Sequence, residues 1–227
     1  MVTRQTKFAL DEYYHLYSRG VDKRPIFLDQ KDRNRFIKLL FVCNGSKPIV
    51  YREIKSLPLS LIETGPKLTA IGAYCLMLNH FHILVRETNE DGVTKFMSKL
   101  LTAYSAYFNK KYNRTGALFE STFKSEHLNT DEYLKYIFSY IHLNPLKIMS
   151  PNWRESNLER LQVERFLESY KESSYLDYSS KEGREESQIL NKLAFPEYFV
   201  DEKAFKNNLF DWFEPPFDQT PTKGYPR

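Results

Sequence analysis

Apolar side chains recur with two different periods along the first 150 residues. Four runs rich in aromatic and β-branched residues have the character of strands, either alternating or continuously apolar. These strands are expected at residues 12–19, 69–78, 80–87 and 117–128. Asn79 separates the second run from the third and marks a tight reversal, so we expect these two strands to pair antiparallel.

Three further segments carry apolar residues three or four positions apart, which predicts amphipathic helices. The helices are expected from Asp29 to near Gly45, from Gly92 to Asn113, and from the cap-like residues 129–132 to Asn144-Pro145. The resulting order is strand, helix, strand, strand, helix, strand, helix. Its first six elements predict an α+β fold, a ferredoxin-like β-α-β-β-α-β sandwich. We expect an antiparallel sheet with helices on one face and the opposite face available to a ligand.

The pattern is weaker in two other segments. Residues 46–68 carry three prolines and little periodicity, which predicts an extended connector. Beyond residue 150 the sequence predicts extra C-terminal helices near residues 160–169 and 203–212 and a proline-rich end from Pro215. We therefore expect a main domain at residues 1–150 and a partly helical C-terminal extension at residues 151–227.

Composition excludes several classes of protein. Hydrophobic residues make up 41% of the 227 positions and charged residues 27%, so the chain can bury a core. Two cysteines exclude a framework of several disulfides and a four-cysteine zinc site, and favour a reducing compartment. The longest apolar stretch is far shorter than the ~20 residues of a membrane helix, and no apolar leader is visible. We therefore expect a cytoplasmic protein with no membrane partner.

The charge is unevenly divided between the two parts of the chain. Residues 1–150 hold 22 Lys and Arg against 14 Asp and Glu, whereas residues 151–227 hold 11 against 15. A basic body favours a polyanionic partner such as nucleic acid, although an ordinary solvated surface would give the same balance. The spacing of the glycines excludes the common G-x-G-x-x-G and P-loop nucleotide sites.

Two short motifs carry candidate chemistry. On a strand, His80 and His82 point to one face, where two imidazoles can chelate a divalent ion or can simply face solvent. On a helix, Tyr140 and Asn144 share a face, which offers a phenol as nucleophile and an amide oxygen as third ligand, or only a stripe facing the core. The remaining histidines, His15, His127 and His142, are interpreted as structural.

The histidine pair and the later tyrosine and asparagine occur together and in this order in a known family. The segments from Tyr74 to Val85 and from Tyr140 to Pro145 resemble those of the single-tyrosine, single-strand transposases of the insertion-sequence-200 (IS200) type. The resemblance is closest to the REP-associated tyrosine transposases (RAYTs). Supporting matches lie at residues 14–20 and 116–125, and in Ser173-Ser-Tyr175 with Tyr178; together the similarity covers roughly residues 10–178.

This resemblance implies an HUH endonuclease on a ferredoxin-like fold in residues 1–150. It implies that Tyr140 is the catalytic nucleophile and that His80, His82 and Asn144 hold a divalent metal ion, Mg²⁺ or Mn²⁺. The implied reaction is nicking and rejoining of single-stranded or hairpin DNA through a 5′-phosphotyrosine, as in DNA transposition and recombination. The implied assembly is a monomer or a homodimer.

A basic cluster with interleaved aromatics is a further candidate for DNA contact. Its members are Lys110, Lys111, Arg114 and Lys124. The alternative is that these cations form an ordinary surface, and for the neighbouring Phe119 and Phe123 we favour a place in the core. Two other functions stay open: a non-catalytic nucleic-acid-binding module derived from such an enzyme, and a metal-dependent phosphoesterase acting on small molecules.

Overall fold

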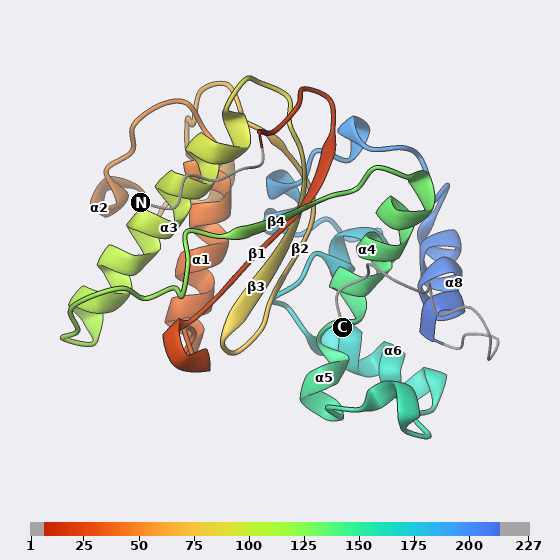
Figure 1. Ribbon diagram of the computed structural model, residues 1–227. Coiled ribbons are helices and arrows are strands. Elements are labelled where there is room, and N and C mark those ends of the chain that lie inside the picture. Colours follow the sequence, from red (N-terminus) through yellow and green to blue (C-terminus); the bar gives the residue numbers. More distant parts are fainter. Residues whose placement is uncertain (1–6, 214–227) are drawn as a thin grey trace.

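A four-stranded antiparallel sheet lies at the centre of the protein, whose computed structural model describes residues 7–213 (Figure 1). The strands are β1 (Tyr13–Arg19), β2 (Ala70–Leu76), β3 (His80–Arg86) and β4 (Lys124–His127). The helices are α1 (Gln30–Cys43), α2 (Tyr51–Ile54), α3 (Gly92–Lys111), α4 (Asp131–Leu143), α5 (Leu146–Met149), α6 (Arg160–Ser169), α7 (Tyr175–Ser179) and α8 (Glu202–Phe213).

The strand order confirms the predicted fold class. The strands lie in the order β2-β3-β1-β4, every neighbouring pair is antiparallel, and α1 and α3 connect them as a ferredoxin-like sandwich requires. The turn at Asn79 joins β2 to β3 as expected. The long run predicted at residues 117–128 is a strand only from Lys124 onward. Leu118 and Phe119 are both buried, so this part of the run does not alternate as an edge strand would.

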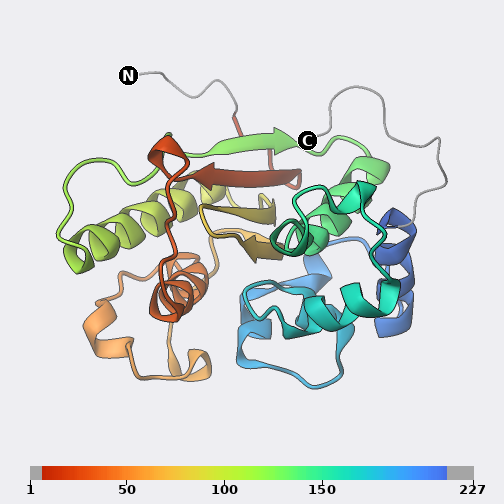
Figure 2. The same ribbon diagram turned by 90° about the horizontal axis from the view of Figure 1, so that it is seen from below.

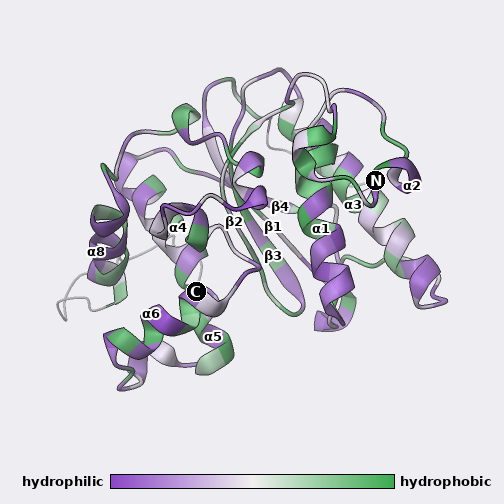
Figure 3. Cartoon of the chain, turned by 180° about the vertical axis from the view of Figure 1, so that it is seen from behind, coloured by the Kyte–Doolittle hydropathy of each residue, from purple (hydrophilic) through white to green (hydrophobic). Residues whose placement is uncertain are grey.

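One face of the sheet packs against α1 and α3 around a large apolar core. Asp29 begins α1 with a capping box, in which its side chain accepts from the Asp32 backbone N–H and the Asp32 side chain accepts in return. Phe36 and Phe81 pack with a ring-centroid distance of 4.9 Å at the centre of this core. Phe119 and Phe123 belong to it, as the sequence predicted. Figure 3 shows hydrophilic residues at the adjoining ends of α1 and α3.

The opposite face is not left open, which corrects the prediction of an uncovered ligand-binding face. Figure 2 shows α4 and the C-terminal segments forming a second layer on this side of the sheet. Ala73, Cys75 and Leu84 point into this layer and are fully buried with Ile137 and Ile141 of α4. The sheet therefore separates two apolar cores, and β1, β4 and the first half of β3 carry the polar part of the second face.

The C-terminal extension shares this second core. The predicted short helices are present as α6 and α8, while the Pro215 segment lies outside the described residues. Residues 172–174 run along the outer edge of β2, where Leu76 donates its backbone N–H to the carbonyl of Glu172 at 2.9 Å. The ring of Phe195 lies over Gly72, where a β-carbon would come within 2.6 Å of it. The domain boundary at residue 150 stays a prediction.

The connector at residues 46–68 is more ordered than its prolines suggest. It contains the one-turn helix α2 and a short 3-10 turn at Leu59–Leu61, and Leu59 and Ile62 are buried in the same core as α1 and α3. None of the helices between residues 7 and 213 combines the length and the apolar character that a membrane crossing demands.

Candidate active site

The two histidines of β3 point to the same sheet face, as the two-residue period of a strand requires. Their ring centroids lie 5.0 Å apart at a right angle. His82 is buried with 5% of its surface exposed, whereas His80 is half-buried near the end of the hairpin. The register pairs Tyr17 with His82 and Arg19 with His80, so these four side chains lie on one surface of β1 and β3.

Helix α4 brings Tyr140 to this surface. Thr130 caps the helix by accepting from the Tyr133 backbone N–H, and the helix ends at Leu143, before Asn144-Pro145. The ring of Tyr140 meets that of His82 edge to face at a centroid distance of 5.4 Å. Asn144 lies one turn beyond Tyr140 and is almost fully buried. Residues far apart in the sequence therefore meet at one place.

Two atoms of this group have no hydrogen-bonding partner. Nε2 of His82 and Oδ1 of Asn144 are both buried and unpaired. Buried polar atoms are rarely left without a partner, and an imidazole nitrogen and an amide oxygen both donate a lone pair to a divalent metal. His80 binds Asn79 Oδ1 through Nδ1 at 2.7 Å, which leaves its Nε2 available. These donors therefore fit a metal ion.

The amide oxygen of Asn144 is the third candidate donor. Among residues 7–213, no three His, Cys, Asp or Glu side chains gather in a way that could hold a metal ion. Two imidazoles and the Asn144 oxygen would leave other coordination positions for water and for a phosphate oxygen. Such a mixed nitrogen and oxygen set suits several divalent metals.

Burial governs the protonation of the site. It lowers the pKa of His80 to about 4, with help from the cations Lys147 and Arg19, and holds the pKa of His82 well below its usual range. Both imidazoles are therefore neutral at pH 7, the form that binds a metal. Burial also raises the pKa of the Tyr140 phenol, opposed by a hydrogen bond from Asn144. The phenol is thus protonated at neutral pH and needs activation before it can attack.

Lys147 is a neighbour that the sequence analysis missed. Its ammonium lies 5.2 Å from the centroid of the Tyr140 ring, and it forms no ion pair with a carboxylate within residues 7–213. The side chain is half-buried, and this burial lowers its pKa. Lys147 lies seven residues after Tyr140, so extending the i, i+4 face by one step would have found it. It provides an unpaired positive charge beside the phenol.

His15 and Glu126 are also missed members of the group. His15 was interpreted as structural, yet its Nε2 lies 2.9 Å from Nδ1 of His82. Nδ1 of His15 in turn faces Oε2 of Glu126 at 3.8 Å. The alternation of His15 and Tyr17 on β1 was the available signal, since it places both on the face of His82.

The other two histidines have the structural roles assigned to them. His142 is buried and binds the Phe138 carbonyl and Ser174 Oγ, both at 2.8 Å. His127 is exposed and pairs with Glu12 at 2.7 Å.

Three members of the predicted basic cluster lie on the other side of the sheet. Lys110, Lys111 and Arg114 are at the end of α3, away from the imidazoles. The ammonium of Lys111 is held by Asp29 at 2.8 Å and Asp32 at 2.7 Å, and Arg114 donates to Asn109 at 3.0 Å. Lys124 is exposed on β4 opposite Tyr17, on the face of the candidate site. The structure therefore brings only Lys124 of this cluster to the imidazole face, and DNA contact by all four stays a prediction.

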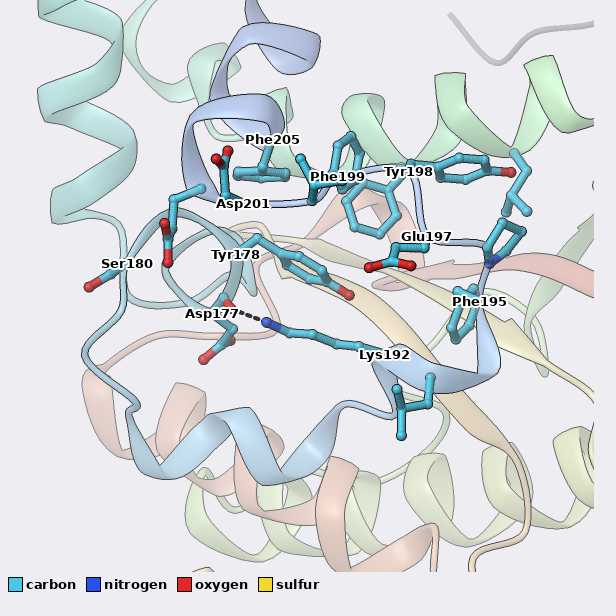
Figure 4. A pocket seen from close by; sticks show the side chains of 16 residues that line it. Asp177, Tyr178, Ser180, Lys192, Phe195, Glu197, Tyr198, Phe199, Asp201 and Phe205 are labelled. Atoms are coloured by element: carbon cyan, nitrogen blue, oxygen red, sulfur yellow. Dashed lines mark hydrogen bonds between the residues drawn. The ribbon is translucent and has the colours of Figure 1, made fainter.

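A hollow of about 490 Å³ lies elsewhere, between α4 and the C-terminal segments (Figure 4). Aromatic rings such as Phe195 and Phe199 line it. Its charged lining consists of one ammonium, Lys192, and four carboxylates: Asp177, Glu197, Asp201 and Glu202. Lys192 already donates to the backbone carbonyl of Asp177. An acidic lining repels phosphate, so we do not assign this hollow to a nucleic acid.

Two comparisons with known proteins gave a match and one gave none. No significant match was found among curated proteins. A solved structure of a REP-associated tyrosine transposase bound to a REP hairpin superimposes with a TM-score of 0.49 at 10% identity, covering 80% of this chain and 87% of that one. The profile of the family described as "Transposase IS200 like" matches residues 34–144, which include both histidines of β3, Tyr140 and Asn144. Over this part of its length, just under half of the chain, the sequence is similar to the IS200-like transposases.

Proposed function

We propose that the protein is a metal-dependent nuclease that nicks and rejoins single-stranded DNA through Tyr140, as a REP-associated member of the IS200-like transposases. The observation that carries this proposal is the meeting of the Tyr140 ring with His82, beside two buried atoms that lack partners. A phenol alone is a poor nucleophile, and two buried atoms without hydrogen-bonding partners would alone only lower the stability of the fold. Together they form a site for attack on a phosphodiester.

His80, His82 and Asn144 would hold the divalent ion, Mg²⁺ or Mn²⁺. When bound there, the ion would neutralise a phosphate oxygen and favour the ionised form of a nearby phenol. The neutral imidazoles are ready to bind it at pH 7, because their pKa values are lowered by burial. The orphaned Asn144 oxygen would gain the partner that it lacks.

The proposed cleavage is an exchange of one phosphate ester for another at Tyr140. The Tyr140 oxygen attacks the phosphorus and loses its proton, a phosphotyrosine bond forms at the 5′ end, and the bond to the 3′ oxygen breaks. The released 3′ oxygen takes up a proton and becomes a free hydroxyl. The phosphotyrosine ester retains the reactivity of the broken bond, so a 3′ hydroxyl can reverse the step and rejoin the strand without a nucleotide cofactor.

The surface around the site favours a polyanion. Lys124 and Lys147 lie on the imidazole side of the sheet, and the ammonium of Lys147 is close enough to Tyr140 to meet the phosphate under attack. Arg19 lies on the same face but is paired with Glu120 at 3.2 Å. Phosphate contacts of this kind position a nucleic acid without reading its sequence. We propose a hairpin with a single-stranded flank as the form of DNA that binds here.

The proposed site is complete within one chain, because Tyr140 and His82 of the same chain already touch. A monomer would then suffice for cleavage. Mixing the inactive His82→Ala and Tyr140→Phe variants tests this point. No cleavage in the mixture is expected, and recovered cleavage would show that the tyrosine serves the site of a partner subunit.

The nucleophile is tested with a labelled hairpin oligonucleotide and Mn²⁺. The parent protein should form an adduct that survives denaturing electrophoresis, and Tyr140→Phe should form none. Tyr136→Phe is the matched control, since Tyr136 lies one turn earlier on α4 with its ring stacked 6.1 Å from that of Tyr140. Adduct formation by Tyr140→Phe equal to that of the parent would refute the assignment.

The burial of Tyr140 favours a second candidate function. Only 8% of its surface is exposed, and burial raises the pKa of its phenol. A protein that binds hairpin DNA without cutting it would show this feature too. Salt-sensitive binding of the hairpin by the parent, with no adduct under Mg²⁺ or Mn²⁺, would support this second function instead.

A further inference from the structure

A row of polar side chains crosses the sheet beneath the candidate metal ligands. It begins at His82 on β3, passes through His15 on β1 and ends at Glu126 on β4. The register places Tyr17 opposite His82 and His15 opposite Glu126, so the row follows one face of three adjacent strands. His15 is completely buried, and Glu126 is half-buried with 27% of its side chain exposed.

Each link of the row has a short or charged contact. His15 Nε2 lies 2.9 Å from His82 Nδ1, and the two rings stack with their centroids 5.0 Å apart. Nδ1 of His15 lies 3.8 Å from Oε2 of Glu126, longer than a hydrogen bond but within reach of its charge. The carboxylate is held in place by hydroxyl donors, Tyr17 at 2.9 Å and Tyr133 at 2.7 Å.

These contacts define where the protons lie. A neutral histidine ring carries one N–H, and the 2.9 Å contact between Nε2 of His15 and Nδ1 of His82 needs one ring to donate and the other to accept. The negative charge of Glu126 favours the proton of His15 on the facing atom, Nδ1. Nε2 of His15 is then an acceptor, so His82 must donate from its own Nδ1. The lone pair of His82 is left on Nε2, the buried atom without a partner.

We propose that His15 and Glu126 are positioning residues for the metal ligand His82: through the row across the sheet they orient its ring and keep its Nε2 unprotonated and aimed at the ion. This inference rests on the proposed function, because it gives the row a purpose only if His82 binds a metal. Neither residue touches the substrate. Groups that bond the second nitrogen of a metal-binding histidine commonly change metal affinity by about 10- to 100-fold.

The first test reads the tautomers directly and needs neither metal nor activity. Two-bond ¹H–¹⁵N correlations of the histidine rings in the parent protein should show His82 and His15 each protonated on Nδ1. In Glu126→Gln the preference of His15 for Nδ1 should weaken, because the charge facing it is removed. Protonation of His82 on Nε2 in the parent would overturn the inference.

The second test measures Mn²⁺ affinity by titration calorimetry on the protein alone. His15→Phe keeps the shape of the ring and removes the acceptor, and should weaken binding by about 10- to 100-fold. His15→Gln offers an amide oxygen to the N–H of His82 and should recover part of the loss. Glu126→Gln should weaken Mn²⁺ binding less than His15→Phe does. Because Glu126 is only half-buried, this substitution does not alter a fully buried position.

His127→Phe is the matched control. His127 lies next to Glu126 on β4, but it points to the opposite face and pairs with Glu12. Its replacement should leave Mn²⁺ affinity unchanged. Unchanged affinity in both His15→Phe and Glu126→Gln would overturn the inference and leave the proposed function intact. Failure of the parent to bind Mn²⁺ would overturn both.

Discussion

Two clusters of buried polar groups, one on each face of the sheet, differ in how completely they are paired. On the face of α1 and α3, the carboxylate of Asp32 is fully buried and accepts from Lys111 at 2.7 Å, Tyr107 at 2.9 Å and Tyr112 at 2.7 Å. The backbone N–H of Leu28 adds another donor at 2.9 Å. On the face of α4, His82 Nε2 and Asn144 Oδ1 have no partner at all.

This difference in pairing distinguishes polar groups that stabilise the fold from polar groups that remain available to a ligand. A fully paired buried carboxylate ties two helices together and has nothing left to offer. An unpaired buried nitrogen or oxygen lowers stability and needs an explanation, and beside Tyr140 a bound ligand would supply one. Lys147, without a carboxylate beside Tyr140, and Lys111, held between two carboxylates, repeat the same contrast among cations.

The largest expected effect is on the rate of cleavage and comes from removing the ammonium of Lys147. Lys147→Gln should slow single-turnover cleavage of the hairpin by about 100- to 1,000-fold, the usual effect of losing a group that stabilises transition-state charge. The free energy of unfolding in urea should not fall, because the ammonium of Lys147 is half-buried without an ion pair and its removal breaks no stabilising contact with a carboxylate. Lys111→Gln is the control and should show the reverse, normal cleavage with lower stability. Normal cleavage by Lys147→Gln would end its proposed role.

The paired face should respond in stability instead. Asp32→Asn should lower the free energy of unfolding by about 2 kcal/mol, less than for a fully buried ion pair because Lys111 is partly exposed. Equilibrium unfolding in urea gives this number. Cleavage by the folded variant should match that of the parent. A stability loss accompanied by slower cleavage would show that the two faces are coupled.

The same carboxylate should make stability depend on pH. Burial alone would raise the pKa of Asp32, but hydrogen bonds from Lys111, Tyr112 and other donors outweigh it, and the net pKa is lowered. A carboxyl with a lowered pKa in the folded state stabilises the protein above its unfolded pKa of about 4. This stability is lost as the pH falls through the folded value. Below pH 5, the free energy of unfolding should therefore decrease less steeply with falling pH for Asp32→Asn than for the parent.

The smallest effect concerns the exposed cation on the site face. Lys124→Ala should weaken hairpin binding a few-fold and reduce the slope of log affinity against log salt by about 1, as for a single phosphate contact. Fluorescence anisotropy over a range of salt concentrations measures both. Lys111→Ala should leave the slope unchanged, since its ammonium already has carboxylate partners. An equal change in both variants would place the DNA across both faces.

The sequence predicted those features that depend on local periodicity. The helix from Asp29 and the strand with His80 and His82 follow from spacing and capping, and α4 stops where the Asn144-Pro145 pair requires. The strand predicted from Ala117 began late, because Leu118 and Phe119 both serve a core that only the folded chain defines. His15 and Glu126 were missed for a related reason, since His15 reaches His82, and Glu126 reaches His15, only through strand pairing.

The covering of β2 by the C-terminal extension has a consequence for assembly. Glu172, Ser174 and Asn191 hydrogen-bond to the outer edge of β2 through their backbones, and hydroxyls of Tyr170 and Tyr178 take two more of its carbonyls. The other edge, β4, has only four residues and carries charge. A sheet with one edge occupied and the other short and charged resists adding strands from a second molecule. Truncation before residue 170 would expose the edge of β2, and the truncated protein should aggregate more than the parent.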